Sequence, residues 1–293
     1  MTPALTRVVL PHGLWRRDVR HREATLRAVT GADEMLALDT DGGSSMAARV
    51  SSLLGCCVEQ IGDIEDEPVA ESVRHLTIGD REALLLHIRA LTFGDRIDCV
   101  LTCPSCHTRL ASDLHVRDLL VTPPADALEW HTTEVRDGDA GTYHVTFRLP
   151  TGADQERVAS EAWRSPDAAA VLLVALCIRE LRRDAGANLP IDSDLPPCVI
   201  THLDNLLQHL DPQAELRLEL PCAVCGAEFD TLFDTASFLL REIESHGSGI
   251  YREVHAIARH YHWSEADILA MTPAKRGRYL DLIAESDGAG ALG

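Results

Sequence analysis

The chain carries the same local pattern twice, as DCVLTCPSCHTRLASDLH at residues 98–115 and as ELRLELPCAVCGAEFDTLF at residues 215–233. In each copy an alternating run of apolar and polar residues leads into Cys-x-x-Cys, and a second alternating run follows it. Two such runs joined by turn residues predict a β-hairpin. Each cysteine pair is therefore expected at a hairpin turn, which is the arrangement of a zinc knuckle.

Two knuckles together supply four thiolates, the ligand set of a closed tetrahedral zinc site. Because four thiolates leave no open coordination position, the ion would be structural, and a catalytic zinc is not expected. The sequence therefore predicts one structural Zn²⁺ ion per chain, held by Cys103, Cys106, Cys222 and Cys225.

Other uses of paired cysteines fit the pattern less well. A thioredoxin-like redox pair lies where a strand enters a helix, and neither pair does. Disulfides belong to oxidising compartments, and the N-terminal residues MTPALTRVVLPHGL lack the apolar stretch of a signal peptide. Two independent, unfilled pairs are a further alternative that would leave reactive thiols exposed. The other cysteines are interpreted as small buried side chains: Cys56, Cys57, Cys99, Cys177 and Cys198.

Sequence similarity between the two halves extends beyond the knuckles. TLRAVTGADE at residues 25–34 matches TFRLPTGADQ at residues 146–155, an offset of 121 residues, and Cys222 follows Cys103 by 119 residues. Amphipathic helical patterns lie between these landmarks in the same order in both halves. A self-similar period of this kind indicates an internal duplication. We predict an α+β fold of two β-α-α-β repeats, each ending in a knuckle and a further strand, joined by one four-cysteine site of zinc-ribbon type.

The predicted organisation follows changes in sequence texture. The stretch LLVTPPADAL reads as a proline-bearing linker, and from residue 235 onward amphipathic helical patterns replace the alternating runs. We predict an N-terminal strand and turn at residues 1–21, repeat 1 at 22–118, the linker at 119–128, repeat 2 at 129–234, a helical C-terminal domain at 235–287 and a disordered tail at 288–293.

Composition restricts the function. The 293 residues carry a formal net charge of −19 and only 4% aromatic residues, which disfavours binding to nucleic acid or to an anionic membrane. The longest apolar run, residues 168–178, is too short to span a bilayer and predicts a helix buried on most sides. Phosphate-binding loops, nucleophile elbows, HExxH and dinucleotide motifs are absent from the sequence. We expect no catalytic residues, no small-molecule substrate and no enzyme activity.

Histidines near the C-terminus are further candidate metal ligands. His260 and His262, two residues apart, cannot share a helical face, and the surrounding pattern is aromatic. Together with His255 they are interpreted as a packed cluster, whose role the sequence leaves open. The basic residues of this end could form a docking face or simply a solvated one, and the solvated interpretation is favoured.

Several short segments resemble one protein family. LRAVTGADE at 26–34, LTIGDRE at 76–82, LTFGDR at 91–96, REVH at 252–255 and YHWSE at 261–265 are similar to segments of contractile-tail baseplate proteins. These occur in phages and in extracellular contractile injection systems, where members are described as hub-assembly or tail-assembly chaperone proteins.

The resemblance implies a non-enzymatic structural or chaperone-like component of a baseplate, with other baseplate or tail proteins as partners. It implies a cytoplasmic protein that can be incorporated in a phage-tail-like particle. No catalytic residue carries over, and the metal-binding pattern maps only onto the four knuckle cysteines. Repeat 2 departs from the family pattern, because HLDP at residues 209–212 replaces the second Gly-Asp-Arg segment. An acidic zinc-ribbon regulatory or binding module outside a tail particle stays open as the alternative.

Overall fold

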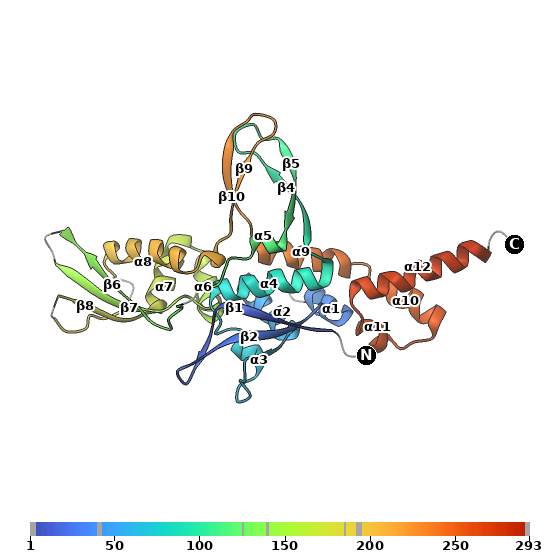
Figure 1. Ribbon diagram of the computed structural model, residues 1–293, viewed down its shortest axis with the longest axis horizontal. Helices are drawn as coiled ribbons and strands as arrows, with labels where there is room; N and C mark the ends of the chain where they lie inside the picture. Colours follow the sequence, from blue (N-terminus) through green and yellow to red (C-terminus); the bar gives the residue numbers. More distant parts are fainter. Residues whose placement is uncertain are drawn as a thin grey trace.

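The structure of the chain, a computed structural model, describes residues 4–39, 43–124, 126–138, 141–184, 186–191 and 195–290. It combines helices with small antiparallel sheets, which confirms the predicted mixture of α and β structure. Figure 1 shows two globular lobes side by side, a pair of hairpins projecting from them, and a group of helices at the end opposite the second lobe. No helix in the described ranges is both long and apolar enough to cross a membrane.

Lobe 1 is a three-stranded sheet, ordered β1-β2-β3, covered by helices. The N-terminal strand pairs with the second strand on both sides of an irregularity between Val9 and Leu14, so residues 5–16 belong to the same sheet as residues 19–27. The elements of lobe 1 are β1 (Leu5–Arg16), β2 (Val19–Arg27), α1 (Gly31–Asp39), α2 (Met46–Cys57), β3 (Val58–Ile61), α3 (Val69–Ser72) and α4 (Ile78–Phe93).

Local sequence explains where the two main helices of lobe 1 begin and end. The Ser45 hydroxyl accepts a hydrogen bond from the backbone N–H of Ala48 and so caps α2, and Thr77 caps α4 in the same way through Asp80. Helix α4 ends at Phe93, and the next residue, Gly94, has a φ of +96° that favours glycine. The apolar faces of these helices and of the sheet are fully buried at Leu10, Leu26, Leu54, Ile61, Leu84 and Ile88.

A helix from far along the chain completes the core of lobe 1. Helix α9 (Thr235–Gly247) places Leu239 and Ile243, both with no exposed surface, in the same apolar cluster as α2 and α4. The helical region predicted to begin at residue 235 therefore starts as part of lobe 1.

Lobe 2 has its own apolar core and a second three-stranded sheet, ordered β6-β7-β8. Phe147, Val199 and Leu203 are completely buried in that core. The elements of lobe 2 are β6 (His131–Arg136), β7 (Thr142–Phe147), α6 (Gly152–Ala162), α7 (Pro166–Cys177), β8 (Ile178–Arg183) and α8 (Pro197–Leu210).

The two lobes share local details at matching sequence positions. The pairing of β2 with β3 shifts register between Thr25 and Leu26, and that of β7 with β8 shifts between Thr146 and Phe147. Immediately afterwards an arginine forms a two-point ion pair with the aspartate of Thr-Gly-Ala-Asp in each lobe. The four N–O distances are between 2.6 and 3.0 Å.

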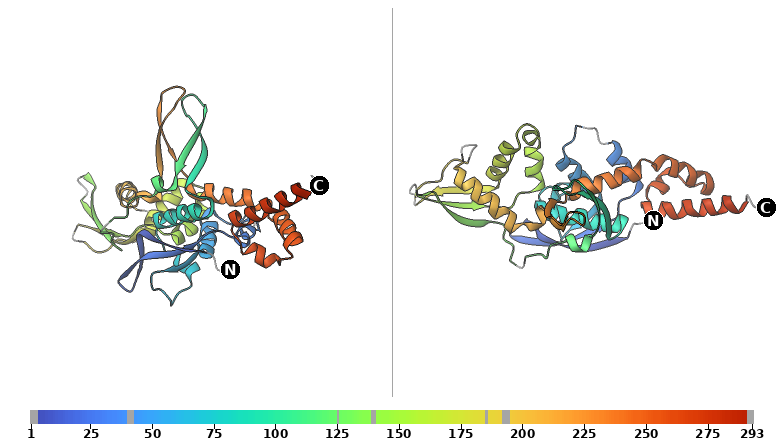
Figure 2. Two further views of the ribbon diagram at one scale, coloured as in Figure 1. Left: turned by 45° about the vertical axis from the view of Figure 1, so that its right-hand side comes forward. Right: turned by 90° about the horizontal axis from the view of Figure 1, so that it is seen from above.

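The projecting hairpins form a tower whose two arms come from distant parts of the sequence. The first arm is β4 (Arg96–Thr102) with β5 (Arg109–His115), and the second is β9 (Arg217–Pro221) with β10 (Glu228–Leu232). Figure 1 and the left view of Figure 2 both show the two arms side by side. Between the arms and the lobes lie the short helices α5 (Val116–Leu119) and η2 (Pro212–Ala214), and an apolar cluster that includes Leu86, Ile97 and Phe233 fixes the base.

The chain ends in a C-terminal module of helices, α10 (Ile250–Tyr261), α11 (Glu265–Leu269) and α12 (Pro273–Gly290). The module begins only two residues after α9 and lies against α1 of lobe 1. Of the predicted disordered tail, residues 288–290 continue α12, and residues 291–293 lie outside the described residues.

Candidate metal centre

Four sulfur atoms meet at the tip of the tower. The Sγ atoms of Cys103 and Cys225 are 3.8 Å apart, those of Cys106 and Cys222 are 3.6 Å apart, and all four lie within 4.8 Å of one another. A tetrahedral ion with Zn–S bonds of about 2.3 Å separates its sulfur ligands by about 3.8 Å, whereas a disulfide bond is only about 2.05 Å long. The distances therefore fit four ligands around one ion and do not fit disulfides.

The backbone of each hairpin turn sets the direction of its two thiols. In the first turn the N–H of Cys103 donates to the Thr108 carbonyl at 3.0 Å, and the N–H of His107 donates to the Cys103 carbonyl at 2.9 Å. The second turn repeats the latter bond between Gly226 and Cys222 at 2.9 Å. The residue after the second cysteine has a left-handed backbone in both turns, with φ of 58° at His107 and 73° at Gly226.

The surroundings of the sulfurs favour thiolates at two positions. Cys103 and Cys222 are buried, Cys106 is half-buried and Cys225 is exposed. The side chain and backbone N–H of Thr108 hydrogen-bond to Cys106 and lower its thiol pKa to about 6. The pKa of Cys222 is also lowered, mainly by the backbone N–H groups of Cys225 and Val224.

The pKa of the Cys225 thiol is shifted in the opposite direction. The backbone N–H of Ala227 favours the Cys225 thiolate, but the adjacent sulfurs of Cys222 and Cys106 outweigh this effect and raise its pKa to about 12. Negative charge therefore cannot accumulate on all four sulfurs by itself. A divalent metal ion would remove that restriction, because coordination deprotonates thiols.

The other residues considered from sequence are not arranged in this way. Within the described ranges, the four tower cysteines are the group of His, Cys, Asp and Glu side chains whose geometry could hold a metal ion. His255, His260 and His262 lie on α10 and its C-cap and are exposed rather than packed. The His260 ring lies edge-on to Tyr261, with 4.8 Å between the ring centroids.

A buried polar cluster between the lobes was not found from sequence. The backbone N–H of His12 donates to Asp80 Oδ1 at 2.7 Å, and His12 Nε2 lies 3.3 Å from Asp211 Oδ1. Asp211 Oδ2 accepts from the N–H of Gly79 at 2.9 Å, and a Cβ at Gly79 would lie 1.8 Å from the other carboxylate oxygen. The sequence segments that form this cluster are Gly-Asp at residues 79–80 and Leu-Asp-Pro at residues 210–212. Their spacing along the chain does not reveal that they meet in the fold.

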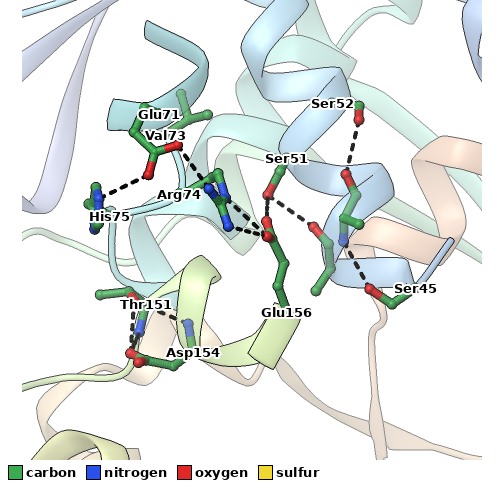
Figure 3. A network of polar contacts seen from close by, with 12 residues as sticks. Ser45, Ser51, Ser52, Glu71, Val73, Arg74, His75, Thr151, Asp154 and Glu156 are labelled. Carbon is green, nitrogen blue, oxygen red and sulfur yellow. Dashed lines mark hydrogen bonds and ion pairs between the residues drawn. The ribbon is translucent and has the colours of Figure 1, made fainter. Parts of the chain in front are cut away.

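A second polar network joins the lobes nearby, as Figure 3 shows. Glu156 on α6 accepts two hydrogen bonds from the guanidinium of Arg74, at 2.8 and 3.0 Å, and one from the Ser51 hydroxyl at 2.5 Å. Arg74 also contacts Glu71 at 2.8 Å. These bonds connect α6 of lobe 2 to α2 and to the segment before α4, so the two lobes meet through specific polar contacts.

Comparison with known proteins gives one family. The family model described as "T4 bacteriophage base plate protein" matches residues 14–240. That range begins near the end of β1, includes most of lobe 1, all of lobe 2 and the whole tower, and ends within α9, before the C-terminal module. No curated protein and no solved structure matches the chain.

Proposed function

The chain belongs to the T4 bacteriophage base plate protein family, and from this we propose that it is a structural or assembly component of the baseplate of a phage-tail-like contractile particle. The match over residues 14–240 carries the proposal. The role is non-enzymatic and chaperone-like, and the partners are other baseplate or tail proteins. The protein acts in the cytoplasm, where such particles assemble, and can be incorporated in the particle.

Zinc is the proposed ion of the four-cysteine site. Four thiolates with tetrahedral spacing are a typical structural zinc set, and a closed set leaves no position for a substrate. Zinc can contribute apparent free energy on the order of 10 kcal/mol to folding. Here Cys103 and Cys106 would hold it from one arm, and Cys222 and Cys225 from the other. The cysteines thereby fasten two arms that share no backbone hydrogen bonds in the described sheets.

An internal duplication is the proposed origin of the two lobes. Three observations support it. The lobes share a strand order, a register shift at matching positions, and an ion pair between an arginine at or directly after the end of the second strand and an aspartate in the first turn of the following helix. Each copy contributes one arm of the tower. The site for the ion then lies where the two copies meet.

A surface suited to protein partners lies beside the lobe junction. An open groove of about 1220 Å³ runs between α2, α6 and α7, and much of its lining is alanine, valine or leucine. Trp163 stands at its edge with 94% of its surface exposed. Exposed tryptophans over small apolar residues are typical anchors of interfaces. We assign this groove to an apolar segment of another baseplate protein.

The tower is a poor candidate for nucleic-acid binding. Its strands carry Asp98, Asp113, Glu219, Glu228 and Asp230 against three arginines, Arg96, Arg109 and Arg217. Ion pairs occupy two of those arginines: Arg96 contacts Asp98 at 2.9 Å, and Arg217 contacts Asp230 at 3.2 Å. The positive field needed to hold phosphates is therefore missing, and the regulatory alternative gains no support from the tower.

The test is quantitative mass spectrometry of purified particles and of the soluble fraction from the native host, with an affinity-tagged chain. We expect identified baseplate proteins to copurify with the tagged chain, and Trp163→Ala to lose them selectively while the exposed substitution Asp204→Ala keeps them. Enrichment in particles identifies a resident part, and recovery only with soluble tail proteins identifies an assembly factor. Recovery of no tail protein in either fraction would refute the proposal.

A further inference from the structure

The contact between the lobes depends on how one helix begins. The backbone N–H of Gly152, at the start of α6, donates to the carbonyl of Leu76 at 3.2 Å, just before α4. Arg81, at the fourth position of α4, is 1% exposed and lies against the same glycine. A Cβ at Gly152 would come within 2.2 Å of Arg81 Nη1, so the arginine fits only because that residue is glycine.

The C-terminal module contacts lobe 1 in the same manner. The N–H of Gly31, at the start of α1, donates to the carbonyl of Met271 at 3.0 Å, just before α12. Arg276, at the fourth position of α12, is also 1% exposed. A Cβ at Gly31 would come within 2.9 Å of Arg276 Nη1. Gly31 and Gly152 are the equivalent residues of the two Thr-Gly-Ala-Asp segments.

The two incoming helices also begin alike. The hydroxyl of Thr77 accepts from the backbone N–H three residues on at 3.1 Å, and the hydroxyl of Thr272 does so at 3.4 Å. Nη1 of Arg81 and of Arg276 each donates to a backbone carbonyl of the chain entering its own helix, at 2.9 Å in both cases. The chain thus uses one docking device twice: a threonine-capped helix start with a buried arginine at its fourth position.

Lobe 1 provides a buried carboxylate that pairs with Arg276. Glu34 on α1 has no exposed surface, its Oε2 accepts from Arg276 Nη2, and its Oε1 has no hydrogen-bond partner among the described residues. Glu253 of the module contacts Arg276 Nε at 2.7 Å. A carboxylate that is covered without a cation is costly, so the site is stably covered only by a chain that presents a guanidinium to Glu34. We call Gly31 and Glu34 the acceptor site.

The occupant of the acceptor site is attached through a very short connection. Only Ser248 and Gly249 separate α9 from α10. The family match ends at residue 240, so the acceptor site lies inside the matched region while its occupant lies outside it. Short connections of this kind favour exchange of a terminal element between copies, because the exchanged contacts are the same ones.

We propose that the acceptor site of lobe 1 is a docking site for arginine-bearing helix starts, and that a second copy of this chain can supply one by exchanging its C-terminal module. In the single chain the site is filled by the chain's own α12. Release of the module in one copy leaves Glu34 available to Arg276 of another. The inference concerns this chain's own residues and does not rest on the baseplate role.

Two full-length variants test the proposal by complementation. Arg276→Ala removes the donor and keeps the acceptor, and Glu34→Ala removes the acceptor and keeps the donor. Each alone is expected to stay monomeric, with hydrogen exchange in α10–α12 faster by at least about a hundredfold and exchange in lobe 2 unchanged. Arg278→Ala, an exposed arginine on the same helix, is the matched control and should exchange like the wild type.

Mixing the two variants restores one intact pair between chains. We expect light scattering after size-exclusion chromatography to show a dimer in the mixture. A chain carrying both substitutions, mixed with Arg276→Ala, offers no intact module and should give none. A mixture that stays monomeric although both modules are released would overturn the proposal, as would modules that remain protected in the single variants. Binding of a tail protein to Arg276→Ala without any dimer would assign the site to that partner and overturn the exchange between copies.

Discussion

The residue after the second cysteine of each pair has a left-handed backbone, as glycine at 226 and as histidine at 107. A left-handed conformation costs a residue with a Cβ roughly 1 kcal/mol, whereas glycine adopts it freely. We expect Gly226→Ala to lower the free energy of unfolding by about 1 kcal/mol. For His107→Gly, relief of strain is offset by the greater freedom of the unfolded chain, so the change should be within about 0.5 kcal/mol.

Urea unfolding of the metal-loaded protein measures both changes. Gly138 has a positive φ of 51° in a hairpin remote from the tower, so Gly138→Ala serves as the control for a left-handed glycine away from the metal site. It should lower stability without changing metal content. A larger loss from His107→Gly than from Gly226→Ala would contradict the assignment of strain to this turn position.

The buried carboxyl of Asp80 makes stability depend on pH. Burial, helped by the nearby charge of Asp211 and opposed by the hydrogen bond from His12, raises its pKa to about 7 from an ordinary value of 3.8. The folded chain therefore binds this proton more tightly than the unfolded chain. The resulting stabilisation is complete below about pH 4 and is lost as pH rises through about 7.

Asp80→Asn should flatten that dependence. The amide can still accept from the His12 N–H and carries no charge for Asp211 to repel, so the variant is expected to be more stable than wild type at pH 8, by at most about 4 kcal/mol. Urea unfolding at intervals from pH 5 to 8 measures the difference between the two proteins. Metal binding affects both alike, and an unchanged pH slope in the variant would argue against a protonated Asp80.

Single residues at the lobe junction show the limit of sequence interpretation. His12 and Asp80 are separated by 68 positions, and no periodicity relates them. The four cysteines could be predicted, because their spacing and turn context are local and their chemistry is specific. The burial of Asp80 and Asp211 could not be predicted, because the sequence does not distinguish an aspartate that becomes buried from one that stays in solvent.

At the scale of elements, the paired arginine and aspartate fasten the first helix of each lobe to its sheet. In lobe 2, Asp154 accepts from Arg148 at two points and also from the N–H and hydroxyl of Thr151, both at 2.8 Å. Loss of these charge-assisted bonds and of the helix cap should cost about 2–3 kcal/mol. We expect this from Asp154→Ala, and equally from Asp33→Ala in lobe 1.

Thermal unfolding followed by circular dichroism checks this, with Asp204→Ala as the exposed control on α8 that should change stability by less than about 0.5 kcal/mol. The folded pKa values of Asp33 and Asp154 are lowered, with burial opposed and outweighed by the bonds from the arginines. Their contribution is therefore present above about pH 4 and is lost on further acidification. Equal stability of Asp154→Ala and wild type would show that the pair is dispensable.

Elements with local signals could be predicted, and those defined by their neighbours could not. The hairpins were predicted within two residues, because strict alternation and turn residues flank each cysteine pair. The apolar run at residues 168–178 predicts a helix buried on most sides; the helix is confirmed as α7, but the predicted burial is wrong. In α7 only Ala169, Val174 and Cys177 are buried, because one side of the helix borders the open groove. An apolar run indicates that the surface of a helix must be covered, but it does not indicate which element or partner covers it.

At the scale of the whole molecule, the four cysteines bring together one arm from each half of the chain at the tip of the tower. We expect one zinc per chain by elemental analysis. Cys103→Ser and Cys222→Ser, which alter different arms, should lose the metal and lower the melting temperature equally, because four ligands act as a unit. Cys198→Ser, outside the tower, should keep the metal. Retention of a full equivalent of zinc by either tower variant would refute the shared site.

The arrangement of lobes and module is the part of the fold that sequence could not supply. The Thr-Gly-Ala-Asp segments indicated two similar units, but the contacts that place them depend on Arg81 and Arg276, which look like ordinary helical arginines. Arg276 meets Glu34 across 242 positions. The family resemblance rested on short segments of lobe 1 and of the C-terminal module, and the family match over residues 14–240 confirms it at the level of a phage baseplate protein.

Helix α9 determines when lobe 1 can complete its core during synthesis of the chain. Lobe 1 begins the chain, yet Leu239 and Ile243, which fill its core, leave the ribosome after every element of lobe 2. Lobe 1 must therefore stay incompletely packed while about 150 further residues, from the end of α4 at Phe93 to Ile243, emerge over several seconds to tens of seconds. A product that stops early leaves an open apolar surface for chaperones and proteases, so only the nearly finished polypeptide can become a competent building block.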